Sequence, residues 1–235
     1  MISQLTKLLV SYKLRCVTDH SSHLLEHILG AKSKVAVLRV VFNSKVGFSG
    51  NTIAKRAGMG LLAIQNALSD LERLGLVEVE RGSVEHRYRL NTKHYLVAHG
   101  LRALYEAERS MVKALARELR PMLDGHVVTA GIFGSFARGR AAAGSDIDLL
   151  VIVETLKERD HVSALLTEKA QGFIERYGLP LQPVIYERRR LNNDGGVYEL
   201  IETAERDWVA IAGADLKQLR KMLSKPKAAS RRRSA

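Results

Sequence analysis

One stretch of the chain combines a small-residue pair, an acidic pair and a long apolar run. Gly134-Ser135 follows the apolar, β-branched segment 127–133, which predicts a strand that ends where a loop begins. After a spacer of ten residues, Asp146 and Asp148 begin a second predicted strand, which continues through five apolar residues. Side chains two residues apart on a strand share a face, so the two carboxylates are expected side by side at one end of a sheet.

This arrangement predicts a metal site. Adjacent carboxylates repel each other unless a cation lies between them. Mg²⁺, or Mn²⁺ in its place, is the expected ion, because hard divalent cations take oxygen ligands and are often held by carboxylates together with substrate phosphates. Gly134 would allow close approach of the backbone to a ligand, and Ser135 offers a hydroxyl and an N–H to a phosphate oxygen. The stretch therefore points to metal-assisted phosphoryl or nucleotidyl transfer.

The Gly-Ser pair, the ten-residue spacer and Asp-x-Asp resemble, in order and spacing, the minimal motif of the DNA polymerase β-like nucleotidyltransferase superfamily. The resemblance implies a nucleoside triphosphate as substrate or ligand, and Asp146 and Asp148 as catalytic carboxylates that hold the metal. Nucleotide-binding candidates are Gly134, Ser135, Arg138, Arg140 and Ser145. The alternative is a surface loop leading into a buried strand that begins with two solvated aspartates.

The superfamily usually has a third carboxylate on a later strand, which helps to deprotonate the attacking hydroxyl. Here Gln182 stands at that position in the predicted strand 181–186. Its amide oxygen can ligate a hard cation, which makes it a weak metal-ligand candidate, but the amide is neutral and is no base. Glu187 would point to the opposite face of a regular strand. The sequence therefore predicts binding of nucleotide and one metal, and leaves open whether the domain is an active enzyme.

A different pattern precedes this motif. Helices are predicted at 34–42, at 52–57 with Ser49 or Asn51 as cap, and at 61–74 with Gly75 as terminator, followed by a hairpin of 76–80 and 86–90. Three helices and a basic hairpin resemble a winged helix-turn-helix domain that binds double-stranded DNA. The resemblance places helix 61–74 in the major groove.

The candidate DNA-binding residues are Gln65, Asn66 and Ser69 on that helix, and Lys55, Arg56, Arg81, Arg87 and Arg89 for the phosphates. The helix begins with Leu61-Leu62-Ala63, and such apolar residues read bases poorly. A winged helix used as a protein-interaction module is therefore the alternative.

The expected fold class is α+β, with a winged helix-turn-helix followed by a small mixed-sheet nucleotidyltransferase domain. The chain as a whole resembles prokaryotic proteins that join these two parts. The expected ranges are a helical segment at 1–30, the winged helix at 31–92, a helical linker with the first transferase helix at 93–121, the transferase domain at 122–216, and a basic tail, expected to be disordered, at 217–235.

The two ends of the chain carry further expectations. Apolar residues at 5–14 and 24–28 suggest a homodimerisation helix. The spacing of Cys16, His20, His23 and His27 also suits zinc, although a polar turn at 19–22 favours the helix. The tail holds eight of the twelve excess positive charges and no acidic residue, so it is either a cationic arm for phosphates or a solubilising segment.

Composition argues for a cytoplasmic protein. No apolar stretch approaches the ~18 residues that span a bilayer, the first residues lack a signal-peptide run, and a single cysteine suits a reducing compartment. Three functions remain open: a DNA-binding nucleotidyltransferase with an unknown acceptor, a transcriptional regulator whose transferase domain only senses nucleotide, and an antitoxin-like enzyme that adenylylates a partner protein.

Overall fold

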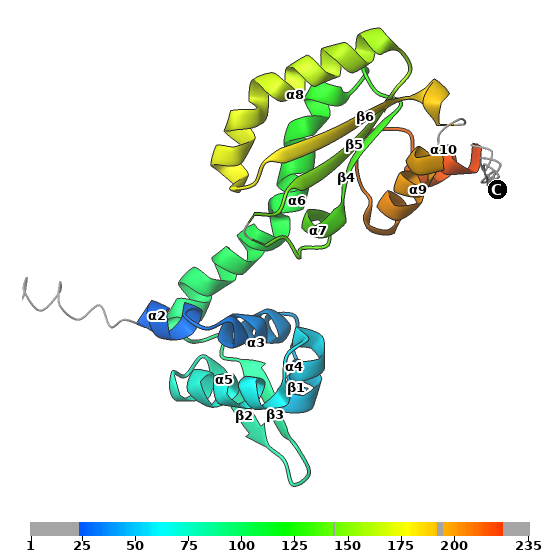
Figure 1. Ribbon diagram of the computed structural model, residues 1–235. Helices are drawn as coiled ribbons and strands as arrows, with labels where there is room; N and C mark the ends of the chain where they lie inside the picture. Colours follow the sequence, from blue (N-terminus) through cyan, green and yellow to red (C-terminus); the bar gives the residue numbers. More distant parts are fainter. Residues whose placement is uncertain (1–23, 143, 192–194, 223–235) are drawn as a thin grey trace, which may run out of the picture. The chain divides into compact units, whose positions relative to one another are not determined.

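The computed structural model describes residues 24–142, 144–191 and 195–222, and these form two compact units with a division between Glu106 and Ala107 (Figure 1). Both units combine helices with a sheet, so the expected mixed α+β class is confirmed. Three of the four candidate zinc ligands, Cys16, His20 and His23, lie outside the described residues, as does most of the segment expected to mediate dimerisation. No helix in the described ranges is long and apolar enough to cross a membrane.

After a short first helix, the first unit contains the three predicted helices followed by the predicted hairpin. Its elements are α2 (Leu24–Leu29), α3 (Lys32–Phe42), β1 (Phe48–Ser49), α4 (Gly50–Ala57), α5 (Leu61–Arg73), β2 (Val77–Arg81), β3 (His86–Leu90), η1 (Val97–Leu101) and the start of α6 (Arg102–Leu123). The two-residue strand β1 was not predicted. It pairs with β3 and completes an antiparallel sheet of order β1-β3-β2.

Local sequence signals explain the helix ends in this unit. The side chain of Ser49 accepts a hydrogen bond from the Thr52 N–H and begins α4, and Gly58, at φ 64°, ends it. One face of α5 is buried against α3 through Ile64, Ala67, Leu68 and Leu71, which recur at helical spacing. The rest of the α5 surface carries exposed polar residues, and its first turn also exposes Leu61, Leu62 and Ala63.

The hairpin lies where the sequence predicted it. Val77 pairs with Leu90 and Val79 with Tyr88; Val77 and Leu90 are buried, and Tyr88 packs against the same core. Arg81 still belongs to β2, so the turn begins one residue later than expected. Gly75, at φ 73°, makes the connection from α5 into the hairpin.

The second unit is a four-stranded sheet covered by helices on both faces (Figure 1). After the rest of α6, its elements are β4 (Thr129–Phe133), α7 (Gly134–Ala137), β5 (Ile147–Val153), α8 (Leu156–Tyr177), β6 (Leu181–Glu187), η2 (Arg188–Arg190), α9 (Gly195–Ala204), η3 (Glu205–Asp207), β7 (Val209–Gly213) and α10 (Leu216–Met222). The strand order is β6-β5-β4-β7, and only the β5–β6 pair among these strands is parallel.

Strand β5 is the centre of the core. Leu149, Val151 and Val153 pack with α6 and α8 on one face, whereas Leu150 and Ile152 pack with α9 and α10 on the other. A strand covered on both faces needs apolar residues at every position. This requirement explains why the run after Asp148 does not alternate between apolar and polar residues.

The expected start of the basic tail at residue 217 is wrong. Residues 216–222 form α10, because Leu216 and Leu219 are buried in the core on the α9 side of the sheet. Trp208 packs against the same core. A Cβ on Gly131 of β4 would lie 2.4 Å from the Trp208 ring, so the glycine leaves room for the indole.

Candidate functional site

The two halves of the motif meet at the end of β4 and the start of β5. These strands are antiparallel, and Phe133 pairs with Asp148, so Gly134 follows directly beside the aspartate. A Cβ on Gly134 would lie 2.1 Å from Oδ2 of Asp148, and the glycine has φ 77°. The backbone conformation therefore favours glycine at this position, and a larger residue would displace the Asp148 carboxylate.

Two local predictions about the motif are wrong. Gly134-Ser135 opens the four-residue helix α7, not a loop, since Phe136 turns into the core. Strand β5 begins at Ile147, so Asp146 precedes the strand and is exposed. The two carboxylates nevertheless interact, because the charge of Asp146 acts on Asp148.

Asp148 is half-buried and carries an unfavourable charge. Its pKa is raised above the ordinary value, mainly because burial disfavours the carboxylate and further because Asp146 is negative. Arg138 acts in the opposite direction. A bound cation would relieve both unfavourable effects.

Gln182 lies next to Asp148 in the sheet. The parallel register of β5 and β6 pairs Asp148 with Gln182, and Gln182 is exposed. Side chains of paired residues in neighbouring strands lie on the same face. The position predicted for a third carboxylate therefore lies at the site, and it holds an amide.

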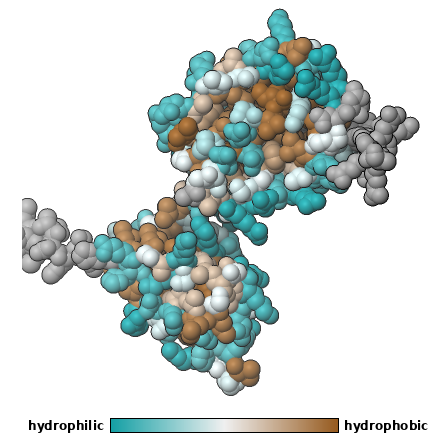
Figure 2. All heavy atoms as spheres, viewed as in Figure 1, coloured by the Kyte–Doolittle hydropathy of each residue, from teal (hydrophilic) through white to brown (hydrophobic). Residues whose placement is uncertain are grey.

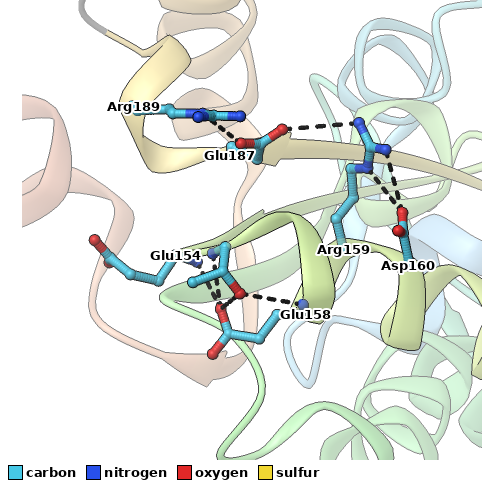
Figure 3. A network of polar contacts seen from close by, with 7 residues as sticks. Glu154, Glu158, Arg159, Asp160, Glu187 and Arg189 are labelled. Atoms are coloured by element: carbon cyan, nitrogen blue, oxygen red, sulfur yellow. Dashed lines mark hydrogen bonds and ion pairs between the residues drawn. The ribbon is translucent and has the colours of Figure 1, made fainter.

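Glu187 lies at the other end of the same strands, where it pairs with Val153. It is 2% exposed, and its carboxylate forms ion pairs with Arg189 at 2.5 Å and Arg159 at 3.7 Å. Figure 3 shows this network beside the capped start of α8. Glu187 is thus an anchor for η2 and α8, and it does not supply the missing carboxylate.

Asp207 lies at the candidate site, although the sequence did not predict it there. Its Oδ2 lies 2.5 Å from a guanidinium nitrogen of Arg138. Strand β7 begins two residues later and pairs Val209 with Ile132, so residue 207 falls at the level of Gly134. The available signal was an acidic residue directly before the apolar segment that closes the sheet.

The remaining nucleotide-binding candidates lie around α7. Arg140 is exposed, and its backbone N–H donates to the Ser135 carbonyl at 2.9 Å. The Ser145 hydroxyl accepts a hydrogen bond from the Ala142 N–H at 2.9 Å and so closes the turn before Asp146. No group of three or more His, Cys, Asp or Glu side chains within the described ranges could hold a metal ion.

The DNA-binding candidates of the first unit differ in their surroundings. Exposed polar residues on α5 are Gln65, Asn66 and Ser69, and Leu62 beside them is 71% exposed. Arg81 is paired with Glu72, and Arg89 with Glu78, each at 2.8 Å. Arg56 stacks on the Phe48 ring. Lys55 and Arg87 are exposed, and neither forms an ion pair with any residue that the structure describes.

Residues 112–203 match the family model of the nucleotidyltransferase domain, a range that includes Gly134, Asp148 and Gln182 and ends before Asp207. Two proteins of Methanocaldococcus jannaschii, both named as candidate protein adenylyltransferases, are similar to parts of the chain. One is 44% identical over 62 residues, which cover 26% of this chain and 42% of the relative. The other is 27% identical over 81 residues, which cover 33% of this chain and 78% of the relative.

Two solved structures resemble parts of the chain more distantly. The predicted DNA-binding transcriptional regulator from E. coli has 17% identity and a TM-score of 0.31, and covers 46% of this chain and 98% of that one. An ICLR-type transcriptional regulator from Silicibacter has 21% identity and a TM-score of 0.23, and covers 44% of this chain and 39% of that one. Scores at this level support no assignment of the first unit.

Proposed function

We propose that the second unit binds a nucleoside triphosphate and transfers its nucleotidyl group to a hydroxyl of a partner protein. The contact of Gly134 with Asp148 carries this proposal, because it joins the two halves of the motif inside the region that matches the nucleotidyltransferase domain. The names of the two archaeal relatives favour a protein as acceptor and an adenylyl group as the part transferred.

The residues of the site fit a hard divalent cation. Two carboxylates, Asp146 and Asp148, lie within electrostatic reach of each other, and the amide oxygen of Gln182 is available on the neighbouring strand. Mg²⁺ or Mn²⁺ bound there would neutralise charge on the triphosphate. The donor set leaves positions for phosphate oxygens, as sites of this kind require.

The chain's own residues would orient the reactants. Ser135 and Arg138 lie beside Gly134, where a hydroxyl and a guanidinium can hold phosphate oxygens. In the transfer, the acceptor oxygen forms a bond to the α-phosphorus while the bond from that phosphorus to the α–β bridging oxygen breaks. Pyrophosphate leaves, and the proton of the hydroxyl passes to water, because Gln182 is no base.

The proposal is tested with the purified chain, each of the four α-labelled ribonucleoside triphosphates, and Mg²⁺, Mn²⁺ or a chelator. We expect metal-dependent binding of at least one nucleotide and release of pyrophosphate when a protein acceptor is supplied. Binding that never leads to pyrophosphate release would favour the second candidate, a nucleotide sensor, which the neutral Gln182 beside Asp148 supports. Absence of metal-dependent binding would contradict both.

Asp207→Asn is expected to weaken nucleotide binding about three- to fivefold, since a partly exposed ion pair contributes up to about 1 kcal/mol. Arg138 would lose the carboxylate that holds it beside Asp148. The measurement is the dissociation constant of the preferred nucleotide, and Asp207→Glu should restore it in part. Glu202→Gln is the matched control, since it removes a carboxylate paired with Arg220 elsewhere in the same unit. An equal loss in the control would contradict a role of Asp207 at the site.

We further propose that the first unit is a winged helix that binds double-stranded DNA. Its support is the order of three helices and a hairpin, with a polar, exposed face on α5. Of the three hairpin arginines, Arg81 and Arg89 are paired with glutamates. Arg87 forms no ion pair with a described residue and is therefore available to contact a phosphate.

Arg87→Ala is therefore expected to weaken duplex binding several-fold and to reduce the slope of log affinity against log salt by about one. Fluorescence anisotropy with a labelled duplex at several salt concentrations measures both. Arg102→Ala, an exposed arginine on α6, is the control. Binding that is absent, or unchanged in Arg87→Ala, would favour a protein-interaction role for this unit.

A further inference from the structure

A shallow groove runs between α6 and the edge strand β7 of the second unit. It encloses about 240 Å³ and is lined by Lys113, Ala116, Arg117, Arg120, Val209 and Ala210. The cations come from the helix, and the strand contributes an apolar wall and its backbone. Such a combination suits a ligand that is both negatively charged and able to pair with a strand.

The positive charge of the groove is not neutralised within the second unit. Lys113 and Arg117 form no ion pair with any described residue, and Arg120 donates its Nε hydrogen to the backbone carbonyl of Ile211 at 2.8 Å. Glu118, the nearest carboxylate along the helix, is held by Arg176 and Tyr177. A ligand with carboxylates would therefore meet cations that have no competing partner.

Strand β7 offers a short stretch of open edge. It is the last strand of the sheet order and is paired with β4 on one side. The register between β7 and β4 shifts by one residue after Ala210, and Arg120 donates a hydrogen bond to the carbonyl of Ile211. The part of the β7 edge that follows Ala210 is therefore not available for pairing with another strand. The open half, Val209 and Ala210, is the half that lines the groove.

The Val209 side of the groove lies at the end of the sheet that carries the site. Val209 pairs with Ile132, two residues before Gly134, and Asp207 contacts Arg138 just before β7 begins. An extended segment paired with the start of β7 would therefore have one end on the side of the sheet where the motif lies.

We infer that this groove docks an acidic, extended segment of the protein that receives the nucleotidyl group, so that carboxylates flank the acceptor hydroxyl. The inference rests on the proposed function and adds the class of acceptor. Residues 223–235 of the chain itself are excluded as occupant by charge, because they contain five cationic side chains and no acidic side chain.

The test uses the full chain and a short fluorescein-labelled peptide in which Asp and Glu flank a single serine. Anisotropy is measured without nucleotide, and a peptide with Asn and Gln in place of the acids is the neutral comparison. We expect salt-sensitive binding of the acidic peptide that is about tenfold weaker in K113E/R117E and intermediate in K113Q/R117Q. The matched control K157E/K169E makes the same charge change on the exposed side of α8 and should bind within about twofold of the unchanged chain.

The outcomes separate this inference from the proposed function. The groove assignment would be overturned if K157E/K169E weakened peptide binding as much as K113E/R117E does, or if the neutral peptide bound as tightly as the acidic one. Preferential binding of single-stranded DNA through Lys113 and Arg117 would also overturn it. Metal-dependent nucleotide binding is measured in every variant and should stay unchanged, which also shows that the variants are folded. If the unchanged chain binds nucleotide but does not bind the acidic peptide, the groove assignment is contradicted and the proposed function is not.

Discussion

Asp148→Asn is expected to reduce metal-dependent nucleotidyl transfer by about 10³-fold, because the loss of a charged metal ligand removes several kcal/mol of charge stabilisation from the transition state. Asparagine keeps the shape of the side chain, so the contact with Gly134 and the pairing with Phe133 should persist. The measurement is the rate of pyrophosphate release at saturating nucleotide and metal. Asp160→Asn, which removes an exposed carboxylate at the start of α8, serves as the control.

The same variant should be no less stable than the unchanged chain when a chelator is present. The folded state raises the pKa of Asp148, so at neutral pH the half-buried carboxylate opposes folding. Asparagine removes that penalty, and we expect a small rise in Tm above the raised pKa that disappears as the pH falls below the ordinary value. A large fall in Tm at neutral pH would mean that Asp148 is a structural residue, and the loss of activity would then not identify a metal ligand.

Gly134→Ala is expected to lower the affinity for nucleotide by at least about 100-fold. The displaced Asp148 carboxylate would lose about 3 kcal/mol of charge-assisted contacts with the metal. A methyl group there would collide with Oδ2 of Asp148 and would have to adopt φ 77°. The carboxylate must therefore leave the position at which it can hold a metal. Isothermal titration with nucleotide and Mg²⁺ measures the loss directly.

Gly139→Ala is a control that separates the two effects of Gly134→Ala, namely backbone strain and collision with Asp148. Gly139 has φ 65°, but a Cβ there meets no atom within 4 Å, so alanine adds the backbone strain of about 1 kcal/mol without the collision. We expect nucleotide binding in Gly139→Ala close to that of the unchanged chain. Similar losses in both variants would show that the loop conformation, and not the contact with Asp148, decides binding.

Much of the local structure could be predicted from residue patterns. The strands β4, β5 and β6 and the helices α3 to α5 all lie close to their predicted ranges. These elements carry their own signals, such as the Ser49 cap and the apolar face of α5. Predictions that depended on where an element begins or ends were less accurate: Asp146 lies before its strand, and residues 217–222 belong to the helix α10 and not to a tail.

The sequence by itself determined the order of the elements and the identity of the motif, because caps, periodicity and spacing act between residues that are near one another in the chain. Only the tertiary structure decided what surrounds the motif. Strand register places Gln182 beside Asp148 and sends Glu187 to the other end of the sheet, and sheet closure by β7 brings Asp207 to Arg138. Register follows from burial on both faces of β5, a property of the whole core that no local pattern contains.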